Sequence, residues 1–112
     1  MKYIGIRKNG RAIVYKVDGN KSMILDPRFD LICHSPTGFE WGYGGSGPAQ
    51  LALAILADFL GNDHLALKLY QFFKNDVITK LPYEGWILEE DEIRRWIRWI
   101  YKMLAVCPGL KE

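Results

Sequence analysis

The sequence predicts an α+β fold, in which an N-terminal antiparallel β-meander packs against a C-terminal three-helix unit with a buried central helix. Short β-branched and aromatic segments fill the beginning of the chain, a glycine-rich loop follows them, and helical periodicity marks the rest. A chain of 112 residues has the usual size of one domain. We therefore expect a single domain, with strands and loop in residues 1–47 and helices in residues 48–106.

Three segments at the start of the chain predict strands. Residues 3–7 and 12–17 flank the dipeptide Asn9-Gly10, which favours the positive φ angles of a two-residue hairpin turn. A second turn signal at residues 18–20 precedes a third strand over residues 22–25, which Pro27 ends.

Residues 26–47 lack a clear periodic pattern and predict a long loop. Loops of this length in a small domain are usually functional or disordered. The loop's aromatic side chains favour an ordered loop that is anchored to the body, and short strands are expected around residues 31–32 and 39–41. These aromatic residues are Phe29, Phe39, Trp41 and Tyr43.

Helices are predicted over residues 48–60 and 64–80, joined by a short break that makes them an antiparallel hairpin. Pro48 suits the first helical position and Gly61 the C-terminal stop. Only Gln50 and Asp58 are polar in the first helix, so it should be buried on all sides, with Asp58 paired to a lysine or capping a neighbouring turn.

Residues 83–88 form a connector that could be an edge strand, and a third helix is predicted over residues 90–106, ending before Pro108-Gly109. Acidic residues four positions before Arg94 and Arg95 predict intrahelical ion pairs. The inward stripe of the third helix consists of Ile93, Trp96, Ile97, Ile100 and Leu104.

The composition excludes several classes of protein. A formal net charge of +2 gives no overall attraction to nucleic acid. No segment has the length of a membrane span or the pattern of a signal peptide, so we expect a cytoplasmic protein with Cys33 and Cys107 as free thiols. No metal-binding cluster and no cofactor is predicted.

The run from Gly42 to Gly47 matches G-x-G-x-x-G and opens a helix, an arrangement that can hold a phosphate or carboxylate. A dinucleotide-binding unit is excluded because a helix hairpin follows instead of a βαβ unit. A P-loop is excluded because Pro48 stands where the lysine is needed. The alternative is that small residues let this loop pack tightly against the helix.

Polar residues with interleaved aromatics lie just before this run. His34 or Glu40 could act as a general base, and aromatic walls suit a planar ligand. The alternative is that these polar side chains stabilise the loop's own backbone. The predicted ligand-binding residues are His34, Ser35, Thr37, Glu40, Trp41, Tyr43, Gly44, Gly45, Ser46 and Gln50.

The third helix carries a basic face that includes an aromatic side chain. The charges favour a solvated face over a nucleic-acid-binding surface, whereas an exposed Trp99 favours self-association or a partner surface. The predicted interaction residues are Arg95, Arg98, Trp99 and Lys102.

The run from His34 to Ala52 resembles the hallmark of a small family of unknown function from bacteria, archaea and mobile elements. The similarity continues in Tyr3-x-Gly5-x-Arg7, in Leu69-Tyr70-x-x-Phe73-Lys74 and in Leu81-Pro82…Trp86. The resemblance implies no activity and no catalytic residue. It implies an accessory protein of a phage or plasmid, which sequesters a signalling nucleotide or blocks a host protein.

The leading functional hypothesis is a small binding module that holds an anionic or nucleotide-like ligand, or a host protein, at the glycine-rich loop. One alternative is a small enzyme that uses Glu40 or His34 beside the loop. The other is an oligomerising protein, such as a homodimer, that acts through the third helix.

Overall fold

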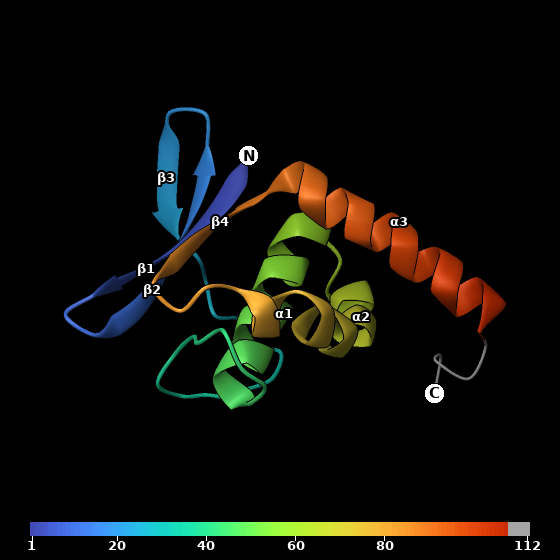
Figure 1. Ribbon diagram of the computed structural model, residues 1–112, viewed down its shortest axis with the longest axis horizontal. Helices are drawn as coiled ribbons and strands as arrows, with labels where there is room; N and C mark the ends of the chain where they lie inside the picture. Colours follow the sequence, from blue (N-terminus) through green and yellow to red (C-terminus); the bar gives the residue numbers. More distant parts are fainter. Residues whose placement is uncertain (108–112) are drawn as a thin grey trace.

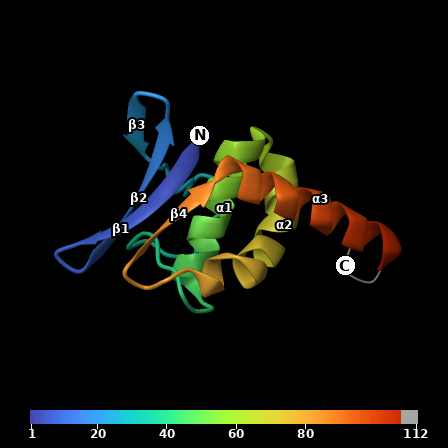
Figure 2. The ribbon, with the colours of Figure 1, turned by 45° about the horizontal axis from the view of Figure 1, so that its top comes forward.

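The computed structural model describes residues 1–107 and confirms the α+β fold (Figure 1). A four-stranded antiparallel sheet is covered on one side by the helices, an arrangement that a second view also shows (Figure 2). The elements are β1 (Lys2–Lys8), β2 (Arg11–Asp18), β3 (Lys21–Ile24), α1 (Ser46–Leu60), α2 (Asp63–Asp76), the 3₁₀ turn η1 (Ile78–Lys80), β4 (Gly85–Glu89) and α3 (Glu90–Val106).

The sheet has the strand order β3-β2-β1-β4. The predicted meander is therefore extended at its β1 edge by β4, a strand that lies between η1 and α3 in the sequence. The predicted hairpin turn is confirmed, because Asn9 and Gly10 have φ angles of 53° and 78°. β4 pairs with β1 and confirms the expected edge strand. The register places Gly5 between Val14 on β2 and Trp86 on β4.

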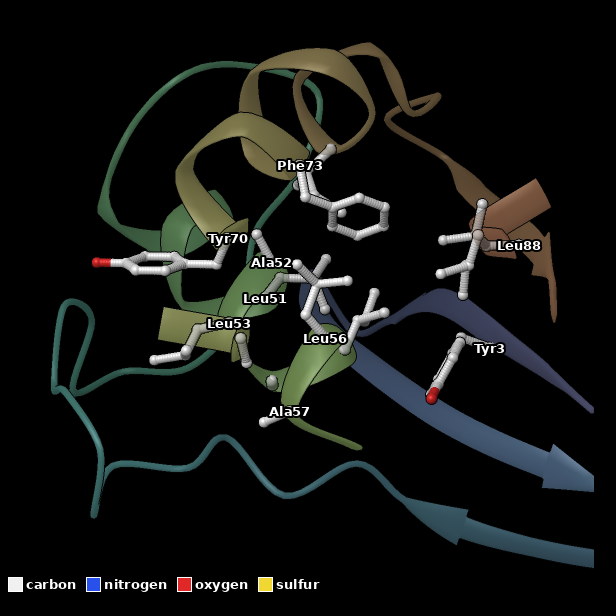
Figure 3. Packing of buried hydrophobic residues seen from close by; sticks show 14 of the residues in the cluster. Tyr3, Leu51, Ala52, Leu53, Leu56, Ala57, Tyr70, Phe73 and Leu88 are labelled. Carbon is white, nitrogen blue, oxygen red and sulfur yellow. The ribbon is translucent and has the colours of Figure 1, made fainter. Parts of the chain in front are cut away.

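Helix α1 is the centre of the core, as its apolar sequence predicts. Every residue from Gly47 to Ala57 is buried, and its leucines pack between Tyr3 and Leu88 of the sheet and the aromatic side chains of α2 (Figure 3). The helix begins at Ser46 rather than at Pro48. Pro48 still lies in the first turn, where a missing backbone N–H breaks no helical hydrogen bond.

Asp58, one of the two polar residues of α1, pairs with a lysine as predicted. Its Oδ2 lies 2.9 Å from Lys16 Nζ on β2 and accepts a hydrogen bond from the Tyr3 hydroxyl at 2.5 Å. Burial and this contact with Asp58 raise the pKa of Tyr3 far above its ordinary value. The carboxylate therefore ties α1 to two strands.

Helix α2 packs along α1, and its first turn is capped because the Asn62 side chain accepts a hydrogen bond from Leu65 N. It ends at Asp76 and not at Lys80 as predicted. The residues that follow are β-branched, and the Thr79 hydroxyl donates to the carbonyl of Asn75, so the chain tightens into η1.

Helix α3 has the predicted bounds and extends away from the body of the molecule (Figure 1). Ile93, Trp96 and Ile100 are buried, which confirms the inward stripe. The Glu90–Arg94 ion pair is confirmed, whereas Asp91 pairs with Arg94 and not with Arg95. The predicted stop at residues 108–109 lies outside the described residues.

The remaining composition-based expectations concern membranes, thiols and metals. Among residues 1–107, no helix has the length and apolarity that crossing a bilayer requires. Cys33 and Cys107 are both exposed and unpaired. In the same part of the chain, no group of three His, Cys, Asp or Glu side chains is placed to hold a metal ion.

Candidate functional site: an anchored loop and an exposed tyrosine patch

The long loop between β3 and α1 is held mainly by side chains. The short strands expected around residues 31–32 and 39–41 are wrong, because these residues join no strand of the sheet. The first anchor is Gln50, whose side chain is fully buried. Its Oε1 accepts hydrogen bonds from the backbone N–H groups of His34 (2.7 Å) and Ser35 (3.2 Å), and its Nε2 donates to the carbonyls of Pro27 (2.6 Å) and Ile32 (3.0 Å).

A second anchor is Arg28, which has a left-handed φ of 58°. Its guanidinium group binds Asp30 within the loop and Asp63 at the start of α2, with N–O distances of 2.8–3.0 Å. These hydrogen bonds lower the pKa of both carboxyl groups below the ordinary value of 3.8. The ion pairs fasten the beginning of the loop to the helix hairpin.

A third anchor joins the loop to the sheet. Arg7 on β1 forms a bidentate ion pair with Glu40, with N–O distances of 2.8 and 3.2 Å. The guanidinium carbon lies 4.6 Å from the Trp41 ring centroid and 3.8 Å from that of Tyr83. Arg7 Nε and Trp41 Nε1 both donate to the Tyr83 carbonyl, at 2.7 and 3.0 Å.

Trp41 is fully buried and meets Trp86 edge to face, with ring centroids 5.4 Å apart. The indole of Trp86 covers Gly5, where an added Cβ would lie 2.3 Å from the ring. A glycine is therefore required on β1 at this point. Trp86 Nε1 is buried without a hydrogen-bond partner, in contrast to Trp41 Nε1.

The two candidate general bases already have hydrogen-bond partners inside the protein. Both oxygens of Glu40 accept hydrogen bonds from Arg7, and His34 Nε2 lies 2.8 Å from the Tyr70 hydroxyl. Of the other polar residues in the constellation, Ser35 is buried and Thr37 is exposed. These partners match the stabilising interpretation of the polar constellation, and the enzyme hypothesis stays a prediction.

The glycine-rich run divides at Tyr43. Before it, Gly42 has a φ of 87° and its N–H donates to the Ile78 carbonyl at 3.0 Å. After the exposed residues comes Gly47, where a Cβ would lie 2.7 Å from Glu40 Cβ. These two glycines serve close packing, which is the alternative that the sequence left open.

Between those glycines lies the exposed part of the loop. Tyr43 is 52% exposed and its ring packs beside Gly45, where an added Cβ would lie 2.9 Å from Tyr43 Cε2. Tyr83, from the connector before β4, is 64% exposed while its ring stacks on Arg7. We define the tyrosine patch as Tyr43, Gly44, Ser46 and Tyr83.

Both tyrosines influence the Arg7 guanidinium group, and the Tyr83 ring stacks on it. Its pKa is raised, first by the hydrogen bonds from Arg7 to Glu40 and to a smaller extent by Tyr83 and Tyr43. Tyr83 thus joins the patch to the third anchor. The candidate residues of α3, which are Arg95, Arg98, Trp99 and Lys102, are all exposed on a separate element.

Sequence reasoning about the constellation did not include Arg7, Tyr83 or Trp86, although they complete the site. Arg7 lies 33 positions from Glu40 and 76 from Tyr83, so spacing alone could not join them. The signal that could have found two of them was the resemblance, whose separate segments contain Arg7 and Trp86. Those segments meet in the structure.

The model of one protein family matches residues 3–99 of this chain. It describes a family of unknown function, DUF6166, and it covers most of the sequence. The chain belongs to the DUF6166 family. No curated protein and no solved structure matches the sequence.

Membership in DUF6166 confirms the resemblance and leaves the activity open. The matched stretch contains all three loop anchors and the tyrosine patch, so these features belong to the part of the chain that the family model describes. The functional argument for this DUF6166 protein therefore depends on the site itself.

Proposed function

We propose that this chain is a small binding module that contacts a partner protein through the tyrosine patch. The observation that carries the proposal is that Tyr43 and Tyr83 are more than half exposed, while the Tyr83 ring stacks on Arg7 and the Tyr43 ring lies beside Gly45. Because stacking on Arg7 restricts the Tyr83 ring before binding, less side-chain entropy is lost when a partner covers it.

The chemistry of the patch suits a protein surface. Tyrosine combines a large ring with a hydroxyl group and is enriched in interface hot spots, and glycine and serine beside it offer adaptable backbone and hydroxyl hydrogen bonds. The segment 42–47 also bears no charged side chain, so the ionised groups that are costly to desolvate lie outside the loop tip.

This proposal fits the mobile-element context that the resemblance implies. An accessory protein of a phage or plasmid that blocks a host protein needs a rigid recognition surface and no catalytic group. The internal partners of His34 and Glu40 support a binding role over the enzyme alternative.

Site-specific photocrosslinking in cells that naturally contain the protein tests this proposal. A photoreactive phenylalanine analogue at position 43 or 83 should yield the same discrete protein adduct. The matched control is Leu67, an exposed apolar position on α2. Equal adducts from position 67, or none from positions 43 and 83, would contradict the proposal.

A second candidate is an anionic ligand, such as a phosphate group, at the start of α1. The specific observation is that, within residues 1–107, this helix has no side-chain cap and no acidic residue in its first turn, so no side chain of the helix itself compensates its positive end. Calorimetric titration with inorganic phosphate tests it. A Ser46→Asp variant should lose phosphate binding while its helix becomes more stable, and an absence of heat with the parent protein would exclude this ligand.

A further inference from the structure

The face of the sheet that points away from the helices is apolar across all four strands. The register places one residue from each strand in a single row, in the order Ile24, Tyr15, Ile4 and Ile87. A second row contains Ile13 and Ile6, and β2 adds one more apolar side chain. We define the outer apolar face as Ile4, Ile6, Ile13, Tyr15, Val17, Ile24 and Ile87.

The helices leave this face uncovered, because they all lie on the other side of the sheet (Figures 1 and 2). In the described part of the chain, its residues belong neither to the core cluster nor to the side chains that pack against that cluster. At the two sheet edges, Ile24 is 68% and Ile87 is 56% exposed. A sheet with one solvated face normally carries polar side chains there, so this pattern marks an interaction surface.

The size of the face matches a stable protein interface. Three gaps of about 4.8 Å between strands, and a seven-residue strand such as β1, give a patch of about 14 by 24 Å before side-chain margins are added. With margins of about 4 Å on each side, the footprint approaches the roughly 800 Å² that each partner buries in a standard interface.

Charged side chains lie at the two ends of the face and leave its centre apolar. Lys8 and Arg11 lie at the hairpin end of the strands, whereas Glu89 lies at the opposite end, next to Lys2. A two-fold axis that runs across the strands would reverse the strands of one copy relative to the other and stack the apolar centres of the two faces. An interface with such symmetry uses the same patch on both copies.

We propose that this outer apolar face binds a second copy of the chain, so that two sheets stack face to face as in a β-sandwich. The proposal concerns a different surface from the tyrosine patch and from the basic face of α3. It predicts a symmetric dimer in which the tyrosine patch of each copy remains free to bind a partner.

The solution mass of the full-length protein tests this dimer. Sedimentation equilibrium should give twice the chain mass of 12.9 kDa. Ile24→Lys and Ile87→Lys should each raise the dimer dissociation constant by roughly tenfold or more, because a lysine charge would be desolvated without a partner. The matched control is Met23→Lys, since Met23 is 57% exposed on the same strand but pairs with Lys16 on the opposite face.

Several results would overturn the proposal. A parent protein that stays monomeric at every concentration would do so, as would lysine variants at positions 24 and 87 that dimerise as strongly as the parent. If Trp99→Ala dissociates the dimer and Ile24→Lys leaves it intact, the interface lies on α3 instead. Circular dichroism of each variant confirms that the fold is retained, and Tyr43→Ala should leave the dimer unchanged.

Discussion

The loop before α1 contains two stretches whose side chains have different surroundings. The anchored stretch comprises residues 26–42. Its polar groups are bound within the protein through Gln50, Arg28 and Arg7. In the exposed stretch, residues 43–46, a tyrosine ring, glycine backbone and a serine hydroxyl face solvent. The comparison teaches that internal partners stabilise the polar constellation, while the short segment after it is exposed to solvent.

Removing the central anchor should have the largest effect on stability. Gln50→Leu keeps the volume of the side chain but leaves two N–H groups and two carbonyls without their partner. We expect a loss of about 3 to 5 kcal/mol in the free energy of unfolding, measured by urea denaturation. The control is Gln71→Leu on the exposed side of α2, which should change stability by less than about 0.5 kcal/mol.

Overpacking the cluster beneath the anchored stretch should have the next largest effect. In Gly5→Ala the new methyl group would overlap the Trp86 indole, which is buried and cannot swing away. We expect a loss of about 2 kcal/mol or more. Gly44→Ala, whose added Cβ meets no atom within 4 Å, is the matched control in the exposed stretch. Equal stability of the two variants would refute the packing argument.

Acid should weaken the ion pairs that fasten the start of the anchored stretch. Because Arg28 lowers the pKa of Asp30 and Asp63 in the folded protein, their contribution is complete above the ordinary value of 3.8 and is lost as the pH falls through the lowered values. The difference in melting temperature between the parent and Arg28→Ala should therefore be largest near neutral pH and shrink below pH 3.8. A difference that grows on acidification would contradict this account.

Much of the fold could be predicted because its signals are local. The dipeptide Asn9-Gly10 determines the first turn, and the nearly unbroken apolar run of α1 determines which helix is buried. The second helix was predicted four residues too long, because the apolar pattern continues through Val77 and Ile78 while the backbone tightens there. Periodicity describes which side chains are buried, and it cannot distinguish an α-helix from a short 3₁₀ turn that buries the same face.

The candidate site was less predictable because its contacts are distant in sequence. Glu40 was a candidate general base in the sequence, and its partner Arg7 lies 33 positions away. Gln50 was predicted to bind a ligand, and in the structure it is fully buried and binds four loop backbone groups. Tyr83 carried no signal in the sequence, because its importance comes from stacking on a guanidinium group from another strand.

The most direct test compares one variant from each stretch for stability and for partner affinity. Once crosslinking identifies the partner, Tyr43→Ala should raise the dissociation constant about tenfold or more while changing the unfolding free energy by less than about 0.5 kcal/mol. Glu40→Gln should lower stability by about 1 kcal/mol and leave the affinity nearly unchanged. If Glu40→Gln abolishes binding at retained stability, or Tyr43→Ala binds as tightly as the parent, the division between an anchored and an exposed stretch is wrong.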